Sequence, residues 1–293
     1  MNGTSATSLV DGRFSILAPA KINWTLRVIG KRPDGFHEIE SLVSTVTLYD
    51  ELVFVAGNGP DLVLVCDAPG VPTDSSNLVS RAAQILAARC GRPCSGCCRL
   101  TKRIPAGGGL GGGSSNAAAT LAALNQLWGL NWPRPRLVEL AAELGSDVAL
   151  FLERGSAVIG GRGEKVAPVK LGWRGWVLLM MPGLHVSTPA VYRAWRPGSG
   201  AAGNVQPRPT TRAMEWMEQT FNMLEAPAIA VCPELGRLQE QATTIAGRPV
   251  RVSGSGSTMF TAFDTQAQAQ VCGDDIRERL AIRTEVVQPL EQV

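Results

Sequence analysis

Six glycines occupy seven consecutive positions between residues 107 and 113, between an apolar, strand-like run and an alanine-rich, helix-like run. Glycine allows the backbone to adopt positive φ and lets N–H groups approach a ligand closely. A helix that begins at the end of such a loop adds free N–H groups and the positive end of its dipole. The segment therefore predicts a phosphate or nucleotide site.

The same loop also satisfies the dinucleotide fingerprint, as Gly107-x-Gly109-x-x-Gly112, so an NAD(P)-dependent dehydrogenase is an alternative. That fingerprint expects an acidic residue about twenty positions further on. The segment 127–133 contains no carboxylate, and the loop contains no lysine of the Lys-Ser or Lys-Thr phosphate loops. Close helix packing could explain one or two of the glycines, but six favour a ligand.

Two charged residues stand in apolar surroundings, where an unpaired charge is costly to bury. Lys21 lies in a strand-like run, and Asp147 lies between a helix end and an apolar run at 148–152 that we expect to be a strand. The two side chains could form a structural ion pair, which spacing alone favours, or could meet at a substrate hydroxyl.

Composition is that of a globular protein, with 45% hydrophobic and 18% charged residues. A length of 293 residues favours two domains or one large one. The net charge of +3 is too small to argue for nucleic acid, and no apolar run is long enough to cross a membrane. Residues 1–10 lack the pattern of a signal peptide.

Four of the seven cysteines, Cys90, Cys94, Cys97 and Cys98, lie close together and raise the possibility of zinc. We favour ordinary buried thiols, because the chain has only two histidines and no second paired-ligand cluster. An odd number of cysteines fits reduced thiols and a cytoplasmic location.

The pattern of apolar residues and turns predicts β-strands early in the chain and mixed elements later. Strands are expected at 14–29 with a break near Pro19, at 41–55, 62–66, 97–104, 148–152, 157–159 and 176–181. Helices are expected at 77–88, with Ser75 and Ser76 as caps, and at 116–128, 136–144 and 214–224. Turns or loops are expected at 31–35, 196–209 and 253–258, and a helix and a strand close the chain.

Three segments together resemble the GHMP kinase superfamily: 19–26 with 30–37, the glycine loop, and the Ser-Gly-Ser-Gly-Ser-Thr run at 253–258. The first is similar to the signature of the 4-diphosphocytidyl-2-C-methyl-D-erythritol kinases, with mevalonate kinase as the nearest alternative in the superfamily. The resemblance implies an α+β fold with an S5-like domain at 1–168 and a ferredoxin-like domain at 169–293, and the active site between them.

The implied reaction is phosphorylation by ATP, with Mg²⁺, of the tertiary 2-hydroxyl of that methylerythritol substrate, in the non-mevalonate route to isoprenoid precursors. By resemblance, Asp147 takes the hydroxyl proton and Lys21 holds Asp147 ionised. The implied substrate contacts are Asn23, Phe36, His37, Thr188 and Tyr192, with Trp195 as an alternative to Tyr192. Neither nucleic acid nor a membrane is an expected partner.

The implied ATP contacts are Pro105, Ala106, Gly107, Gly108, Gly109, Leu110, Gly111, Gly112, Gly113, Ser114 and Ser115. Ser114 or Ser115 is expected near Mg²⁺, although either hydroxyl could instead cap the helix. The C-terminal glycine motif, expected to close the site, comprises Ser253, Gly254, Ser255, Gly256, Ser257 and Thr258.

The chain departs from the subfamily pattern at three positions. Phe36 replaces the usual tyrosine, Ala149 replaces proline, and Met223 interrupts the usual Asn-Asp-Leu-Glu at 222–225. These departures leave open a shifted substrate preference or a weakened paralogue. A GHMP-fold protein that binds a ligand or partner without chemistry is a further alternative, which requires Lys21 or Asp147 to be misplaced.

Overall fold

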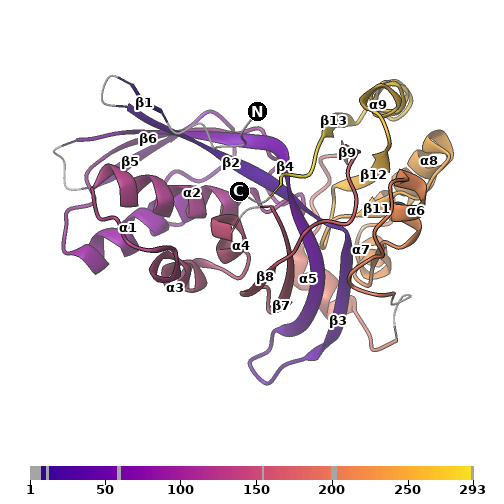
Figure 1. Cartoon of the computed structure of the whole chain (residues 1–293), viewed down its shortest axis with the longest axis horizontal. Helices are drawn as coiled ribbons and strands as arrows, with labels where there is room; N and C mark the ends of the chain where they lie inside the picture. Colours follow the sequence, from indigo (N-terminus) through magenta and orange to yellow (C-terminus); the bar gives the residue numbers. More distant parts are fainter. Residues whose placement is uncertain (1–7, 11–12, 58–60, 154, 199–202, 292–293) are drawn as a thin grey trace.

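The computed structural model describes residues 8–10, 13–57, 61–153, 155–198 and 203–291. These residues form two β-sheets and the helices packed against them, which confirms the expected α+β class (Figure 1). Part of the segment considered for a signal peptide, residues 1–7, lies outside the described residues, as do residues 199–202 of the expected loop at 196–209.

The larger sheet has nine strands and is built around one long strand, β4 (His37–Val55), which pairs with four neighbours. One of these neighbours is β2 (Arg13–Asn23), which pairs antiparallel with β4. Its register shifts between Pro19 and Ala20, where the sequence predicted a break. The remaining strands are β1 (Ser8–Val10), β3 (Thr25–Lys31), β5 (Leu62–Cys66), β6 (Gly96–Thr101), β7 (Ser156–Gly161), β8 (Lys165–Pro168) and β10 (Phe221–Asn222).

Four helices cover one face of this sheet: α1 (Leu78–Cys90), α2 (Gly112–Leu127), α3 (Arg134–Leu144) and α4 (Val148–Glu153) (Figure 1). The central helix, α2, buries small residues on most of its surface and packs against both α1 and β2. Small side chains allow this close approach, so the alanine-rich run explains why the helix lies deep in the core. The end of the glycine loop is thereby fixed to the sheet.

The smaller sheet contains β11 (Arg251–Val252), β12 (Met259–Phe263), β9 (Trp176–Met181) and β13 (Arg283–Val287), in that spatial order. With α8 (Pro233–Ala246) after β9 and α9 (Gln266–Leu280) after β12, the order is that of a ferredoxin-like βαββαβ unit, as expected. The second half also contains α5 (Thr188–Ala194), α6 (Ala213–Glu218) and α7 (Glu225–Val231).

Buried aromatic rings join the two sheets. Trp24, which separates β2 from β3, makes edge contacts with Trp173, Trp216 and Phe260, at centroid distances of 5.4–5.6 Å. In addition, β10 from the second half pairs in parallel with β3 of the first half. The division at 168/169 stays a prediction, because chain from the second half completes the first sheet.

Several expected elements are wrong in type or boundary. Residues 148–152 belong to the helix α4 and not to a strand, because a short apolar run has no diagnostic period and its tertiary neighbours are α2 and α3. The expected helix at 214–224 ends with α6, and β10 follows. The cap of α1 is Asn77 instead of Ser75 or Ser76, and α2 begins at Gly112, inside the loop.

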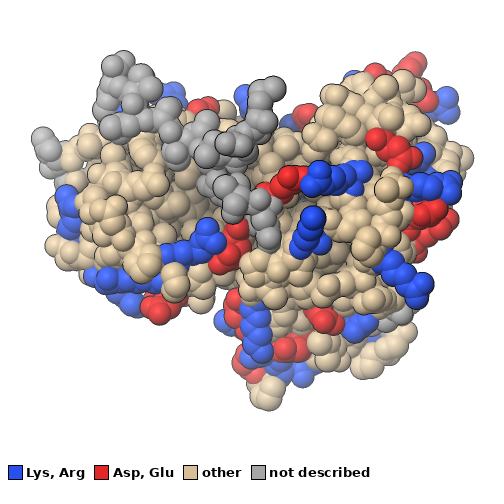
Figure 2. All heavy atoms as spheres, in the orientation of Figure 1, with Lys and Arg blue, Asp and Glu red and all other residues tan. Residues whose placement is uncertain are grey.

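All seven cysteines are free. Within the described residues, no group of three or more His, Cys, Asp and Glu side chains is placed to hold a metal ion. No described helix is long and apolar enough to span a bilayer. On the face shown in Figure 2, basic and acidic side chains are interspersed.

Candidate active site

Lys21 and Asn23 project from the same face of β2, because side chains two positions apart on a strand point the same way. Both are buried, with exposed fractions of 6% and 3%. Lys21 Nζ donates to Asn23 Oδ1 at 2.6 Å, and Asn23 Nδ2 donates to Ser41 Oγ at 2.8 Å. Burial lowers the pKa of Lys21, and the negative charge of Asp147 partly opposes this shift.

Asp147 lies in the turn immediately before α4, at the positive end of that helix, and not at the start of a strand. A Cβ built on Gly163, in the turn between β7 and β8, would lie 3.0 Å from its Oδ1. No described residue donates a hydrogen bond to its carboxylate or forms an ion pair with it. Lys21 and Asp147 interact through space without a direct ion pair, so the carboxylate is available to a ligand.

The three motifs of the sequence meet around this pair. The backbone N–H of Lys21 donates to Leu110 O of the glycine loop at 3.0 Å. From the C-terminal motif, Ser253 Oγ donates to Gly109 O at 3.2 Å and Thr258 N donates to Gly108 O at 3.1 Å. The loop is thus held between β2 and the turn that joins β11 to β12.

Part of the glycine content is explained by this packing alone. A Cβ on Gly109 would collide with Ser253 O, and one on Gly111 would lie 2.7 Å from the Phe151 ring. At Gly112 a Cβ would lie 2.9 Å from Ile104 Cγ2, and at Gly108 it would lie 3.0 Å from Thr258 Oγ1. Close packing therefore accounts for four of the six glycines, more than the one or two expected.

The first turn of α2 has the features of an anion site. Its N-cap, Gly111, has φ +70° and makes no side-chain capping bond, and Ser114 and Ser115 lie inside the helix. Neither serine is the N-cap, so the capping alternative does not hold. Ser115 Oγ is buried and has no hydrogen-bond partner among the described residues, whereas the Ser114 side chain is partly exposed.

Aromatic side chains of α5 and of the residue that follows it gather around His37, the first residue of β4. His37 stacks on Tyr192, with ring centroids 5.0 Å apart, and meets the edge of Trp195 at 5.7 Å. Burial, and to a lesser extent the charge of Asp147, raises the pKa of Tyr192, and burial with nearby Lys31 lowers that of His37. Both aromatic candidates, Tyr192 and Trp195, therefore contact His37.

Two other expected substrate residues lie around this group. Phe36 is 51% exposed, and the Arg162 guanidinium lies 4.8 Å from its ring centroid. Thr188, the first residue of α5, shares a 2.7 Å hydrogen bond with Ser255 Oγ of the C-terminal motif. That bond connects α5 to the turn between β11 and β12.

Comparison with known proteins agrees with these motifs. The GHMP kinases N terminal domain matches residues 77–155, and the GHMP kinases C terminal domain matches residues 209–282. A 4-diphosphocytidyl-2-C-methyl-D-erythritol kinase of Nitrosospira multiformis is 39% identical, covering 92% of this chain and 90% of its own. The enzyme of that name from Geobacter sp. (strain M21) is 35% identical, covering 91% and 95%. The chain belongs to this kinase family.

A solved structure leads to the same assignment. The crystal structure of a 4-(cytidine 5'-diphospho)-2C-methyl-D-erythritol kinase superposes with a TM-score of 0.77 at 34% identity, covering 94% of this chain and 98% of the other. A GHMP kinase uses ATP as its co-substrate, so the glycine loop and the free N-terminus of α2 are the groups to examine for triphosphate binding.

A buried polar network beneath the loop was not anticipated from the sequence. Asp50 of β4 is fully buried and forms a 2.5 Å ion pair with Lys102 Nζ. It also accepts from Asn116 Nδ2 at 2.9 Å and from two backbone N–H groups that precede the loop. A lone aspartate in the apolar run of β4 was the available signal, and only the fold reveals its partners.

The departure at Ala149 has a simple structural setting. Ala149 lies in α4, two residues after Asp147, and is 2% exposed within the apolar core of the first half. Neither alanine nor proline has a polar side-chain group, so the substitution removes no side-chain hydrogen bond. The change from proline therefore leaves the described polar groups of the site in place.

Proposed function

We propose that this protein is an ATP-dependent kinase that phosphorylates the tertiary 2-hydroxyl of 4-diphosphocytidyl-2-C-methyl-D-erythritol. One observation carries the proposal: Lys21 and Asp147 interact electrostatically without a direct ion pair, where the glycine loop meets the C-terminal motif. A substrate hydroxyl between the two charges would complete their hydrogen bonding. The 35–39% identity to kinases of this name over about nine-tenths of the chain supports the choice of substrate.

In the proposed reaction, Asp147 accepts the proton of the substrate hydroxyl while its oxygen attacks the γ-phosphorus of ATP, and the bond from that phosphorus to the β,γ-bridging oxygen breaks to release ADP. Phosphoryl transfer has a loose transition state, so the protein mainly positions the reactants and neutralises charge on phosphate oxygens. Lys21, held by Asn23, supplies a positive charge in a buried setting where the electrostatic interaction is stronger than in water. The negative Asp147 favours the charged form of Lys21.

The triphosphate would be bound by backbone N–H groups of residues 106–114, at the glycine loop and the start of α2, because Pro105 has no N–H and that of Ser115 already donates to Gly111 O. Free N–H groups and the helix dipole act together there, because no side chain caps the helix. Mg²⁺ would be held mainly by phosphate oxygens, with the Ser114 and Ser115 hydroxyls as the protein groups close by. When bound, the ion neutralises charge that develops on the transferred phosphoryl group.

The cytidyl group would bind beside Phe36, His37 and Tyr192. Phe36 presents an exposed aromatic ring, and such a ring can stack on a nucleobase because every base has a π face. Burial lowers the pKa of His37 and so favours the neutral imidazole, which has one nitrogen to donate and one to accept. Free thiols fit a reducing compartment, and we propose a cytoplasmic location.

A coupled assay of ADP release tests the proposal, with diphosphocytidyl-methylerythritol, mevalonate and homoserine offered in parallel. We expect turnover only with the first, and ³¹P NMR of the product should place the new phosphate on the oxygen of the tertiary 2-hydroxyl. Turnover only with mevalonate would overturn the substrate assignment and leave the superfamily intact. Binding of a nicotinamide cofactor without ADP release would instead favour the dehydrogenase alternative.

A further inference from the structure

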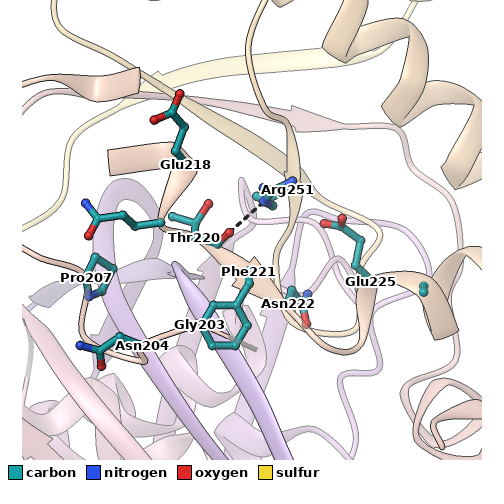
Figure 3. Close-up of a pocket in the computed structure, with 11 residues that line it drawn as sticks. Gly203, Asn204, Pro207, Glu218, Thr220, Phe221, Asn222, Glu225 and Arg251 are labelled. Atoms are coloured by element: carbon teal, nitrogen blue, oxygen red, sulfur yellow. Dashed lines mark hydrogen bonds between the residues drawn. The ribbon is translucent and has the colours of Figure 1, made fainter. Parts of the chain in front are cut away.

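A cavity of about 550 Å³ lies in the second half of the chain, where β10 and α7 approach β11. Figure 3 shows Asn222, Glu225 and Arg251 around it, with Arg251 bonded to Thr220. Asn222 and Glu225 belong to the segment that partly matches the family pattern Asn-Asp-Leu-Glu. Their hydrogen bonds all lead to the backbone near the C-terminal glycine motif or to their own turn.

The side-chain amide of Asn222 uses both of its protons and its oxygen. Nδ2 donates to Val252 O at 2.8 Å and to Gly254 O at 2.7 Å. Oδ1 accepts from the backbone N–H of Leu224 at 2.9 Å. One amide therefore fixes two carbonyls of the turn and its own local backbone at once.

Glu225, the first residue of α7, binds the same segment through a backbone N–H group. Its Oε2 accepts from the backbone N–H of Val252 at 2.9 Å. Together the two side chains bind the N–H and C=O of Val252 and the C=O of Gly254. We refer to Asn222 and Glu225 as the backbone clamp.

The other side of the clamped segment faces the proposed catalytic lysine. A Cβ built on Gly254 would lie 3.4 Å from Lys21 Nζ and 3.2 Å from Asn23 Oδ1, and its φ of +59° also suits glycine. Ser253 Oγ accepts from Asn23 N at 3.3 Å and donates to Gly109 O. A shift of this segment would therefore change the walls around Lys21 and the glycine loop together.

The clamp is also fixed to the strand that continues from the Lys21 strand. Asn222 pairs with Leu26 in the parallel ladder between β10 and β3, and Met223 N donates to Leu26 O at 2.9 Å. Met223, the residue that departs from the family pattern, packs its side chain into the apolar core and takes no part in the clamp. The departure therefore leaves the clamp intact.

We propose that Asn222 and Glu225 are positioning residues for the proposed kinase reaction: they hold Val252–Gly254 against Lys21, Asn23 and the glycine loop. They touch neither reactant and act through the backbone of the motif. This inference rests on the proposed function, because its effect is read in the rate of phosphoryl transfer.

The test compares Asn222→Asp, Glu225→Ala and Glu225→Gln. Asn222→Asp keeps the shape of the side chain but replaces the Nδ2 donor by an oxygen, which would face the carbonyl oxygens of Val252 and Gly254. Glu225→Ala removes the acceptor for the Val252 N–H, whereas Glu225→Gln keeps a carbonyl oxygen as acceptor. Displacing a reacting group by about 1 Å can lower the reaction rate by up to about 10²-fold. We therefore expect the single-turnover rate and kcat to fall by about 10- to 100-fold in Asn222→Asp and Glu225→Ala. Both KM values should change much less, and Glu225→Gln should restore most of the rate.

Gln239→Ala is the matched control, because Gln239 Nε2 donates to Val250 O at 2.9 Å, a bond of the same kind to backbone that precedes the motif. Gln239→Ala should keep the wild-type rate even though it loses about as much thermal stability as the Asn222 and Glu225 variants. An equal rate loss in the control, or no difference between Glu225→Ala and Glu225→Gln, would overturn the inference. If Asn222→Asp does not fold, the Glu225 pair still decides. An inactive wild type would count against the proposed function itself.

Discussion

The ammonium group of Lys21 donates a 2.6 Å hydrogen bond to Oδ1 of Asn23, two residues further along the same strand. An ammonium group has three protons, and this bond is the one that the described residues accept from Lys21. Asn23 is itself held in place, because its Nδ2 donates to Ser41 Oγ in the first half of the chain and its backbone N–H donates to Ser253 Oγ in the second half. The residue that orients Lys21 is therefore fixed by both halves. The remaining protons are free for a ligand beside Asp147.

Replacing Asp147 by Asn should remove the proposed base and keep its shape. General base catalysis contributes about 10²- to 10⁴-fold, so kcat should fall by about that factor while ATP binding, measured by calorimetry, is retained. Glu153→Gln, at the far end of α4, is the control and should keep its activity, because Glu153 pairs with the exposed Arg134 on the surface. Near-normal turnover of Asp147→Asn with ATP bound would remove Asp147 from its role.

Lys21→Met should inactivate the enzyme and stabilise the fold. Burial lowers the pKa of Lys21, so the unfolded chain binds this proton more tightly than the folded chain does. The charged lysine therefore costs stability below its folded pKa, and wild-type stability should recover as pH rises through that pKa toward the ordinary lysine value. Methionine removes the desolvation cost.

The thermal midpoint at pH 7 checks this prediction, with a gain of roughly 2–4 °C expected for each kcal/mol. The gain should shrink at alkaline pH, because the wild-type lysine is then neutral. Wild-type kcat should also decline at alkaline pH, below the ordinary lysine range, as Lys21 loses its charge. A lower midpoint for Lys21→Met at pH 7 would contradict the burial argument.

Asp50→Asn should destabilise the protein strongly. It removes the charge that pairs with Lys102, whose side chain is 8% exposed, and leaves a buried ammonium without its counter-ion. Breaking a buried ion pair in this way costs about 3–5 kcal/mol. Unfolding in urea measures the loss, and the Kd for ATP should rise because the network lies beneath the glycine loop.

Asp67→Asn provides the control for that experiment. Asp67 accepts a 2.9 Å hydrogen bond from the backbone N–H of the same Lys102, but at an exposed position. Asparagine keeps an acceptor there, so we expect a cost below about 1 kcal/mol. Equal losses in the two variants would show that the buried charge pair has no special importance.

Phe36→Ala should weaken binding of the cytidyl substrate with little effect on the fold, since Phe36 is 51% exposed. Loss of one base-stacking contact costs about 1–3 kcal/mol, or roughly 5- to 150-fold in KM. Phe36→Tyr keeps the ring and should stay close to wild type. The KM for ATP should not move, and an equal rise in both KM values would place Phe36 outside the cytidyl site.

Local patterns were sufficient where the residues themselves set the geometry. The strands at 41–55 and 62–66, the strand at 176–181 and the loop at 253–258 were predicted correctly. So was the passage from strand to glycine loop to helix, because glycine and alanine clustering is a signal within a few residues. Boundaries were less certain, since α2 begins four residues earlier than expected.

Short apolar segments were not decided by their own sequence. Residues 148–152 and 214–224 carry too few turns for periodicity to separate helix from strand, and their tertiary neighbours determined the outcome. The helical form of 148–153 has a consequence for the site, because it puts Asp147 at the positive end of α4. The same limit applied to the Asn222–Glu225 segment, whose role depends on residues about thirty positions away.

Contiguous motifs in the sequence were enough to point to the family, and the resemblance to that family implied the ferredoxin-like second half and the candidate residues. Tertiary structure alone decided how those motifs meet: Lys21 against Gly254, Asp50 with Lys102, and the backbone clamp on Val252. Such contacts join residues far apart in the chain, and their geometry depends on strand register and core packing. A one-residue change in register would turn each side chain to the opposite face of its strand, so no local pattern can specify them.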